Sequence, residues 1–333
     1  MAAIEQPVSV HRSSLGQRVR GVILSQEGVL LIIGLIAVLL LSTQNANFLT
    51  SSNLLNQIRL VTEIGLMALP MTFIIITGGI DLSVGSIFGM SAIILGFAWQ
   101  DMGLPLEVAI VICLVVGVIA GFINGFFIVR VGVPPLIMTL ATLALYRGVA
   151  LGISEARSAR GFPEWFFEIG AGTFLGVPTQ IWVLVIFIII SGLLLGRTRF
   201  GRGLYAIGNN EVAARFSGIP VAAYKLAIYS FSGLMAAIAG WIFTSRVSTT
   251  RSDMGTGMEL DVIAAVVLGG TSIFGGSGTI TGTVIGLVLI QLLKNGLSLS
   301  GVRGDATVIV VGVVLILAIL INTFIQRRTG AAG

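Results

Sequence analysis

The sequence consists mostly of long, uninterrupted runs of apolar residues, and this property restricts the fold more than any other. Runs such as Leu30–Leu41 and Ile181–Leu195 contain no charged residue, and charged residues make up only 10% of the chain. Such runs are typical of helices that cross the hydrocarbon core of a membrane, which is about 30 Å thick. They do not alternate between apolar and polar residues, which argues against a transmembrane β-barrel. The sequence therefore predicts an all-α, polytopic membrane protein.

Ten apolar segments can be delimited, which predicts about ten transmembrane helices between residues 27 and 326. They lie at about 27–42, 54–77, 82–99, 106–129, 134–153, 179–196, 224–245, 260–274, 280–297 and 306–325. Residues 1–26 and 327–333 form polar tails. The basic tail before the first segment is also seen in signal peptides, but the many later segments favour an uncleaved first helix.

The distribution of basic residues predicts that both termini lie in the cytoplasm. Ten spans that begin inside place eleven of the nineteen Lys and Arg residues on the cytoplasmic side and six outside. This bias agrees with the positive-inside rule. Because the basic residues are scattered over helix ends, the net charge of +5 does not indicate nucleic-acid binding.

Composition argues against several classes of enzyme. The single cysteine, Cys113, lies in an apolar run, and the single histidine, His11, lies in the polar tail, so neither predicts a metal site. A phosphate-binding P-loop requires a Gly-Lys pair, whereas the two lysines, Lys225 and Lys294, follow tyrosine and leucine. No catalytic group, metal or cofactor of the chain's own is therefore expected.

The longest polar interruption is the strip Thr198–Gly218, TRFGRGLYAIGNNEVAARFSG. Gly201 and Gly203 are expected to permit a turn, and Asn209-Asn210 to cap the start of a helix. Glu211–Phe216 then predicts a short amphipathic helix that ends at Gly218 and Pro220.

This short helix has the features of a docking element. Ala213 and Ala214 would let another surface come close, and Glu211 and Arg215 are spaced for an ion pair. The helix would lie parallel to the membrane and present itself to a cytoplasmic protein. The alternative is an ordinary solvated loop whose arginines follow the positive-inside rule.

Two glycine-rich turns resemble each other, Gly78–Gly85 (GGIDLSVG) and Gly269–Gly276 (GGTSIFGG). Transporters often contain internal repeats whose glycine-interrupted segments mark the translocation route, although glycine-rich composition alone can produce such a likeness. Asp81 in the first turn is expected to cap a helix or shape a gate, with direct contact to a polar substrate as the alternative. The candidate path or gate residues are Asp81, Ser83, Ser86, Gly269 and Gly270.

Other charged residues also lie near apolar segments. Arg59 and Glu63 are spaced i to i+4 and are expected to pair. Glu259 and Asp261 begin the eighth segment, where acids complement the helix dipole. A second interpretation gives Glu259 and Asp261 a role in outer docking or in solute access.

Four motifs, spread in order over most of the chain from about residue 50, resemble a known family. They are GGIDLSVGS (Gly78–Ser86), VPPLIMTLATLALYRG (Val133–Gly148), TRFGRGLYAIGNNEVAARFSGI (Thr198–Ile219) and the segment Glu259–Gly286. The chain resembles the membrane-spanning permease subunits of ribose-type ATP-binding-cassette sugar importers. That family includes permeases for other monosaccharides and for the sugar-like signal autoinducer-2.

The resemblance implies a multi-pass permease domain in a bacterial inner membrane, with three kinds of protein partner. A second permease subunit would complete the pore, a cytoplasmic ATPase with two nucleotide-binding domains would hold ATP and Mg, and a periplasmic sugar-binding protein would deliver the solute. Residues 197–223 would form the loop that couples the permease to the ATPase. The contacts assigned to it are Arg202, Asn209, Asn210, Glu211, Ala213, Ala214, Arg215 and Gly218.

Two departures from the family pattern bear on the substrate and on the second subunit. Met258 stands where an aromatic residue usually precedes the Glu-Leu-Asp motif, and Ala306–Ile325 lacks a basic residue sometimes found there. The sugar, and the choice between a homodimer and a heterodimer, therefore stay open. The competing interpretation is an ion-coupled secondary transporter of a small polar solute, which would need more embedded ionisable residues than Asp81 and the Arg59/Glu63 pair. A passive channel is a third possibility.

Overall fold

A computed structural model describes residues 26–304, 306–313, 316 and 320 of the chain, and nearly all of its regular structure is helical. The helices before the polar strip are α2 (Gln26–Gln44), α3 (Ser51–Ile76), α4 (Val84–Gln100), α5 (Leu106–Phe126), η1 (Phe127–Val131), α6 (Pro135–Ser154), η2 (Glu164–Phe166), α7 (Phe167–Gly170) and α8 (Thr179–Arg197). They are followed by α9 (Arg199–Asn209), α10 (Glu211–Phe216), α11 (Val221–Val247), α12 (Met258–Leu268) and α13 (Ile280–Leu299). Among the described residues the strands are β1 (Thr173–Phe174) and β2 (Val177–Pro178), which pair antiparallel. The predicted all-α class is confirmed.

Six of the described helices are long and apolar enough to cross a membrane. They are α3, α5 with η1, α6, α8, α11 and α13. α4 is apolar but shorter, with 17 residues. The chain is therefore a polytopic membrane protein. The tenth predicted segment is helical at residues 306–313, whereas most of its remainder, the tail 327–333 and the tail through residue 25 lie outside the described residues. The count of ten spans stays a prediction.

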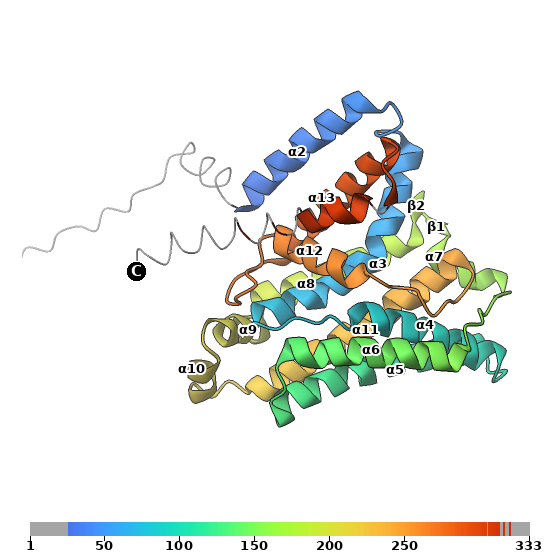
Figure 1. The fold of residues 1–333 in the computed structure, drawn as a ribbon. Helices are drawn as coiled ribbons and strands as arrows, with labels where there is room; N and C mark the ends of the chain where they lie inside the picture. The colour runs from blue at the N-terminus through green and yellow to red at the C-terminus, as the bar shows by residue number, and fades with distance from the viewer. Residues whose placement is uncertain (1–25, 305, 314–315, 317–319, 321–333) are drawn as a thin grey trace, which may run out of the picture.

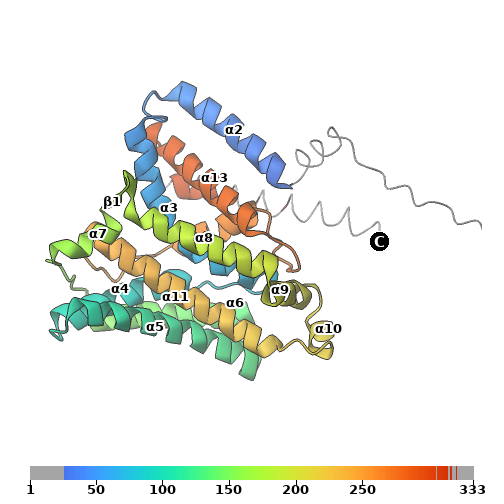
Figure 2. The ribbon, with the colours of Figure 1, turned by 180° about the vertical axis from the view of Figure 1, so that it is seen from behind.

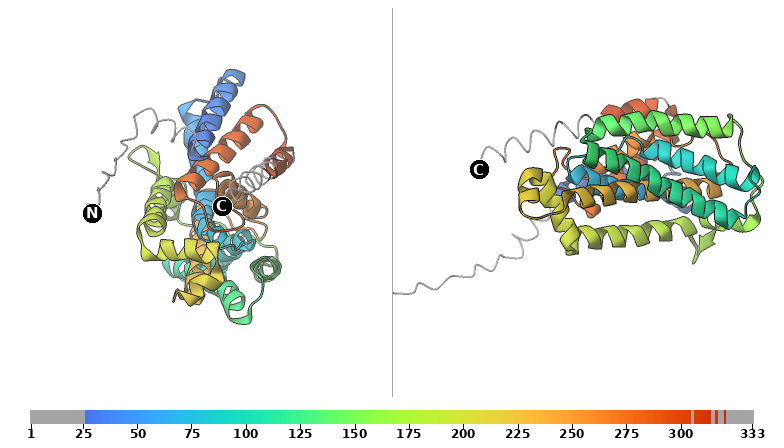
Figure 3. Two further views of the ribbon diagram at one scale, coloured as in Figure 1. Left: turned by 90° about the vertical axis from the view of Figure 1, so that its left-hand side faces the viewer. Right: turned by 90° about the horizontal axis from the view of Figure 1, so that it is seen from below.

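Helices α5 and α6 run nearly horizontally in Figure 1, and α11 slants past them at the centre of the molecule, where it contacts α3, α4 and α5. α3 also contacts α8, α12 and α13, and α2 packs on α13. Helices α9 and α10 lie at one end of the bundle, and α7, β1 and β2 lie at the other, as the view from behind also shows (Figure 2). Figure 3 shows the same bundle end-on and from below.

Two helices begin inside the protein and cross only part of its thickness. After α3 ends at Ile76, residues 77–83 turn back into the protein, and α4 starts at Val84. From the opposite end, the segment after α11 runs along α4 until Gly255 meets Gly85, and α12 starts at Met258. The 11 residues of α12 span about 16 Å, roughly half of a bilayer core. The N-termini of α4 and α12 therefore meet in the interior, an arrangement found in transporters with broken helices.

The predicted segment 260–274 is wrong at its C-terminal side. α12 ends at Leu268 because Gly269 and Gly270 end the helix, and Gly270 adopts a φ of +93°. A side chain there would be strained, so a glycine is needed to turn the chain.

Glycines allow the central helices to approach closely. There is no space for a β-carbon at Gly117 and Gly121 of α5, which lie against the backbone of α11, or at Gly233 of α11 itself. Gly269 and Gly282 make the same close contact between α12 and α13. Small residues drive helix association in lipid because dispersion contacts replace the hydrophobic effect there. Much of the high glycine content is explained by this packing.

Candidate functional site

The polar strip folds into two short helices at one end of the bundle. Asn210 caps α10, with its side-chain oxygen accepting a hydrogen bond from the Ala213 N–H at 2.9 Å, and Gly218 follows with a φ of +81°. The predicted helix Glu211–Phe216 and its cap are confirmed. The turn expected at Gly201 and Gly203 is wrong, because both residues lie inside α9. They are glycines because their backbones press against Leu195 and against the ring of Tyr224.

α10 presents an apolar face outward that the sequence analysis did not single out. Ala214 is only 4% exposed and packs with Ile207 and Val221, so it does not face a partner. Ala213 is exposed, and Phe216 and Val212 are 90% and 64% exposed. The i to i+4 spacing of Val212 and Phe216 places both side chains on one face of the helix and could have revealed it.

Glu211 fixes α10 to the start of α11. Its carboxylate pairs with Arg215 at 3.2 Å, as predicted, and also with Lys225 at 2.6 Å, a partner that the sequence did not indicate. Burial raises the pKa of Glu211, but the hydrogen bond and charge of Lys225, together with Arg215, outweigh it and hold the pKa below its usual range. Beside α10 lies a cavity of about 700 Å³ whose lining includes Arg130 of η1, Arg215 and Lys225.

α9 joins α10 to both glycine-rich turns. Gly208 lies directly against the Ile76 carbonyl and the Gly276 N–H, and these two groups share a hydrogen bond of 2.9 Å. The Tyr205 hydroxyl donates a 2.7 Å hydrogen bond to the Gly278 carbonyl. Gly275 lies close to Gly78, so the two turns meet at this end of the protein. A displacement of α9 would therefore also move the segments that lead into α4 and α13.

Asp81 is fully buried and holds the start of α4 against α11. One oxygen accepts hydrogen bonds from the Ser83 N–H at 3.0 Å and the Ser83 hydroxyl at 2.6 Å, and the other accepts from Ser232 at 2.8 Å. Asn124 of α5 donates to the Ser83 oxygen at 2.7 Å, and Ser86 donates to the Ser83 carbonyl. The expected role of Asp81 as the helix cap is wrong in detail, because Ser83 is the residue that precedes α4 and its side chain makes no capping hydrogen bond. Asp81 instead bonds Ser83, just before the helix, and Ser232 of α11.

The five residues assigned to the path or gate line none of the main cavities of the described chain. Asp81, Ser83 and Ser86 are buried in the polar network, and Gly269 packs against Gly282. Gly270 is partly buried in the turn that follows α12. Their role in a gate stays a prediction, and their contacts are those of a packed core.

The acids of α12 lie inside the protein rather than at an exposed end. Asp261 pairs with Lys294 of α13. One Glu259 oxygen accepts a 3.2 Å hydrogen bond from the Gly257 N–H, and the other lies beside Gly85 with no hydrogen-bond partner among the described residues. Their placement at a helix start agrees with dipole stabilisation.

The expected pair of Arg59 and Glu63 is wrong. Glu63 binds Arg246 of α11, with 2.9 Å between Oε1 and Nε, and the Arg246 guanidinium lies 4.9 Å from the centre of the Phe243 ring. Arg59 makes no ion pair with Glu63, and its buried Nε has no hydrogen-bond partner among the residues that the structure describes. A buried carboxylate takes the cation that tertiary packing places beside it, and sequence spacing does not reveal this choice.

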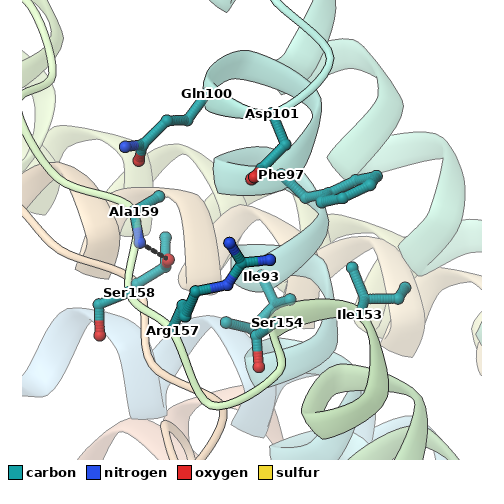
Figure 4. A pocket seen from close by; sticks show the side chains of 10 residues that line it. Ile93, Phe97, Gln100, Asp101, Ile153, Ser154, Arg157, Ser158 and Ala159 are labelled. Carbon is teal, nitrogen blue, oxygen red and sulfur yellow. Dashed lines mark hydrogen bonds between the residues drawn. The ribbon is translucent and has the colours of Figure 1, made fainter.

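A small pocket of about 120 Å³ opens at the end of the bundle opposite α10, between the ends of α4 and α6. Figure 4 shows Arg157 extending its guanidinium into the pocket below Asp101, while its charge pairs with Glu155 at 3.1 Å. Gln100 accepts a hydrogen bond from the Arg160 N–H and so ties the loop after α6 to α4. The end of the bundle opposite α10 is therefore polar, and a hydrogen bond to α4 holds its loop in place.

Cys113 is buried with its thiol near the Ala237 carbonyl, as expected for a core residue. Within the described part of the chain, no group of three or more His, Cys, Asp or Glu residues is arranged to hold a metal ion.

Matches to known proteins cover most of the chain. The profile of the family described as branched-chain amino acid transport system / permease component matches residues 53–319. The ribose import permease protein RbsC of Bacillus subtilis is 43% identical over 79% of this chain and 82% of its own length. The RbsC protein of Escherichia coli is 39% identical over 90% of this chain and 94% of its own. The autoinducer 2 import system permease protein LsrD of Yersinia enterocolitica is 40% identical over 70% and 72%. No solved structure matches.

Proposed function

The chain belongs to the family of branched-chain amino acid transport system permease components, and we propose that it carries a monosaccharide or a related sugar-like solute as the permease subunit of an ATP-binding-cassette importer. The relatives that cover most of the chain are named for ribose and for autoinducer 2, which supports a sugar-like solute rather than an amino acid. As a transport subunit, the chain is not itself an enzyme.

The remaining parts of the importer are proposed as separate subunits. A cytoplasmic ATPase with two nucleotide-binding domains binds ATP and Mg, a periplasmic binding protein delivers the sugar, and a second permease subunit completes the pore in the bacterial inner membrane. The absence of a P-loop in the sequence supports a separate ATPase. The end of the bundle that carries α10, Arg130 and Lys225 is the cytoplasmic end in this proposal, and both termini lie on that side.

The observation that carries the proposal is the exposed apolar face of α10. Phe216 is 90% exposed on a short helix that Lys225 and Asn210 hold in place. Large apolar side chains presented on an ordered element are typical anchors of protein interfaces. The basic cavity beside α10 offers a second contact for an acidic surface of the ATPase.

The contacts of α9 provide a route by which movement of the ATPase can reach the core of the permease. When the nucleotide-binding domains close, they displace α10, and α9 passes this displacement to Ile76 and Gly276 through the tight contact of Gly208. A ligand-driven change of this kind requires α10 to contact the two ATPase states differently. At the opposite end, the surface around Arg157 is proposed to contact the binding protein, and Glu259 and Asp261 are proposed to act in solute access from the interior.

The test of this assignment uses Phe216→Asp in the permease produced together with its ATPase partner. Losing an interface anchor costs about 2 kcal/mol or more, so we expect ATPase association to weaken roughly 30-fold and uptake to fall with it. Leu175→Asp, at a residue that is 77% exposed at the other end of the bundle, is the matched control and should keep the ATPase bound. Normal ATPase binding and normal uptake by Phe216→Asp would remove α10 as the docking element.

A further inference from the structure

A polar cavity of about 420 Å³ lies between α3, α11 and α13, away from the residues assigned above to the path or gate. Its polar lining residues are Asn56, Gln57, Glu63, Arg246, Gln291, Lys294, Asn295 and Ser298. Four apolar residues, Leu60, Ile64, Phe243 and Met258, complete the lining. Met258 is the first residue of α12, so the cavity reaches the interior point where α12 begins. Its volume falls in the range of about 300–1,000 Å³ that is usual for small-molecule sites.

The polar side chains of the cavity are held in place by one another. Gln291 donates to Gln57 at 2.6 Å, and Gln57 donates to Asn53 at 3.2 Å. Asn53 and Asn295 exchange two hydrogen bonds of 2.9 and 3.0 Å. The result is a chain of four amides that joins α3 to α13. Amides fixed in this way are preorganised to bind a ligand at little cost in conformational entropy.

The cavity continues toward the end of the molecule opposite α10. At Asn56 it adjoins a second polar cavity of about 750 Å³, whose lining includes Asn47, Thr50, Asn53 and Arg59. Within the described part of the chain, the buried Nε of Arg59 has no hydrogen-bond partner. Buried donors normally have partners, so this N–H is available to a ligand or to water in the second cavity.

The opposite side of α3 and α13 is mostly apolar. There a groove of about 340 Å³ between α3, α8 and α13 is lined almost entirely by Leu, Ile and Val, with Gln57 and Gln291 at its border with the polar cavity. An apolar groove can face acyl chains, whereas unsatisfied polar groups facing hydrocarbon would each cost several kcal/mol. The polar side of these two helices must therefore face water or protein.

The charged residues of the cavity are paired with residues of opposite charge, and this favours a neutral ligand. Glu63 neutralises Arg246, and Asp261 neutralises Lys294, so no unpaired charge faces the lining from these pairs. Amides can donate to and accept from hydroxyl groups, and the apolar lining suits a face made of C–H groups. A polyhydroxy compound such as a monosaccharide combines both kinds of surface.

We propose that this cavity is a binding station for a neutral polyhydroxy solute on the side of the translocation route away from α10. The amides of Gln57, Gln291 and Asn295, which line the cavity, bind the hydroxyl groups, and Asn53 holds Gln57 and Asn295 in place by hydrogen bonds. This inference deepens the proposed sugar-import function and depends on it for the identity of the solute.

The first test is the double variant Gln57→Leu/Gln291→Leu. Replacing both members of a hydrogen-bonded pair by apolar groups of similar size leaves no unpaired group, so the protein should still fold and bind its ATPase. We expect the KM for monosaccharide uptake to rise roughly tenfold because two hydrogen bonds to the solute are lost. Gln180→Leu replaces a buried glutamine of α8 outside the cavity, whose amide has no hydrogen-bond partner among the described residues, and should leave KM unchanged. An unchanged KM in the double variant would overturn the proposal.

The second test does not depend on uptake. In a Cys113→Ala background, Met258→Cys should react with a membrane-impermeant maleimide added from outside, and ribose or another monosaccharide should slow labelling about tenfold near saturation. Met235→Cys is the matched control, because Met235 is fully buried in the core and should not react. A wild-type importer that carries none of the monosaccharides tested would refute the proposed function. The labelling experiment tests the cavity separately. Slower labelling of Met258→Cys in the presence of sugar supports the binding station. If Met258→Cys is not labelled, or is labelled equally fast with and without sugar, the binding station is overturned.

Discussion

Glu63 shows how tertiary structure decides which charges pair. Arg59 lies one helical turn away in the sequence, but Glu63 binds Arg246, which lies 183 positions later. The Glu63 side chain is only 2% exposed, so it needs a cation that approaches from a neighbouring helix. Sequence spacing gives no information about such a partner. The same limit applies to Lys225 with Glu211 and to Lys294 with Asp261.

Removing one member of the buried pair should destabilise the protein strongly. Glu63→Ala leaves the Arg246 guanidinium partly buried without its partner, so we expect a loss of about 3–5 kcal/mol in the free energy of unfolding. The measurement is unfolding of the purified protein in detergent, and Glu63→Ala/Arg246→Leu should recover most of the loss. Glu155→Ala breaks a pair whose side chains are about 70% exposed and should cost less than about 1 kcal/mol. Equal losses in Glu63→Ala and Glu155→Ala would contradict the assignment of a structural ion pair to Glu63.

At the scale of helices, local signals predicted α10 but not α9. A cap at Asn210, an amphipathic hexapeptide and a closing glycine are all encoded within a few residues, so the helix Glu211–Phe216 could be delimited from the sequence. Gly201 and Gly203 usually indicate a turn, but here they allow α9 to pack against α8 and Tyr224. This contact with a distant residue outweighs their weak helix propensity.

The hydrogen bond between Tyr205 and Gly278 should be needed for coupling but not for docking. Tyr205→Phe removes the hydrogen bond from α9 to Gly278, just after the second glycine-rich turn, without changing α10. We expect ATPase association and ATP hydrolysis to persist while uptake per ATP falls severalfold. Tyr224→Phe is the matched control, because Tyr224 stacks on Phe200 and no described hydrogen bond joins its hydroxyl to the turn. Uptake per ATP that is unchanged in Tyr205→Phe would exclude this contact from the coupling route.

At the scale of the whole molecule, hydropathy cannot reveal that α4 and α12 start in the interior. The segments 82–99 and 260–274 are apolar like the others, and the sequence therefore predicts ordinary spans for both. In the structure, α4 and α12 start in the interior and meet near Gly85. The buried acid Asp81 indicated such a helix start, because an interior carboxylate needs donors at a helix N-terminus. The polar cavity beside α3 and α13 had no comparable signal, since its amides come from segments more than 200 residues apart.

The two ends of the bundle should lie on opposite sides of the membrane. In a Cys113→Ala background, Leu175→Cys in the hairpin of β1 and β2 should react with an impermeant maleimide on intact spheroplasts. Val212→Cys on α10 should react only after the membrane is opened, because the basic end is expected in the cytoplasm. Both variants should be labelled in detergent, which controls for reactivity. The reverse pattern on spheroplasts would invert the proposed orientation.

The most direct test of the permease assignment is uptake of a labelled monosaccharide into proteoliposomes that contain the permease with its ATPase and binding protein. The account predicts uptake that requires ATP and the binding protein, that is abolished by a hydrolysis-deficient ATPase, and that is insensitive to an uncoupler. Uptake that persists without the ATPase and collapses with the uncoupler would contradict the account and establish an ion-coupled transporter instead.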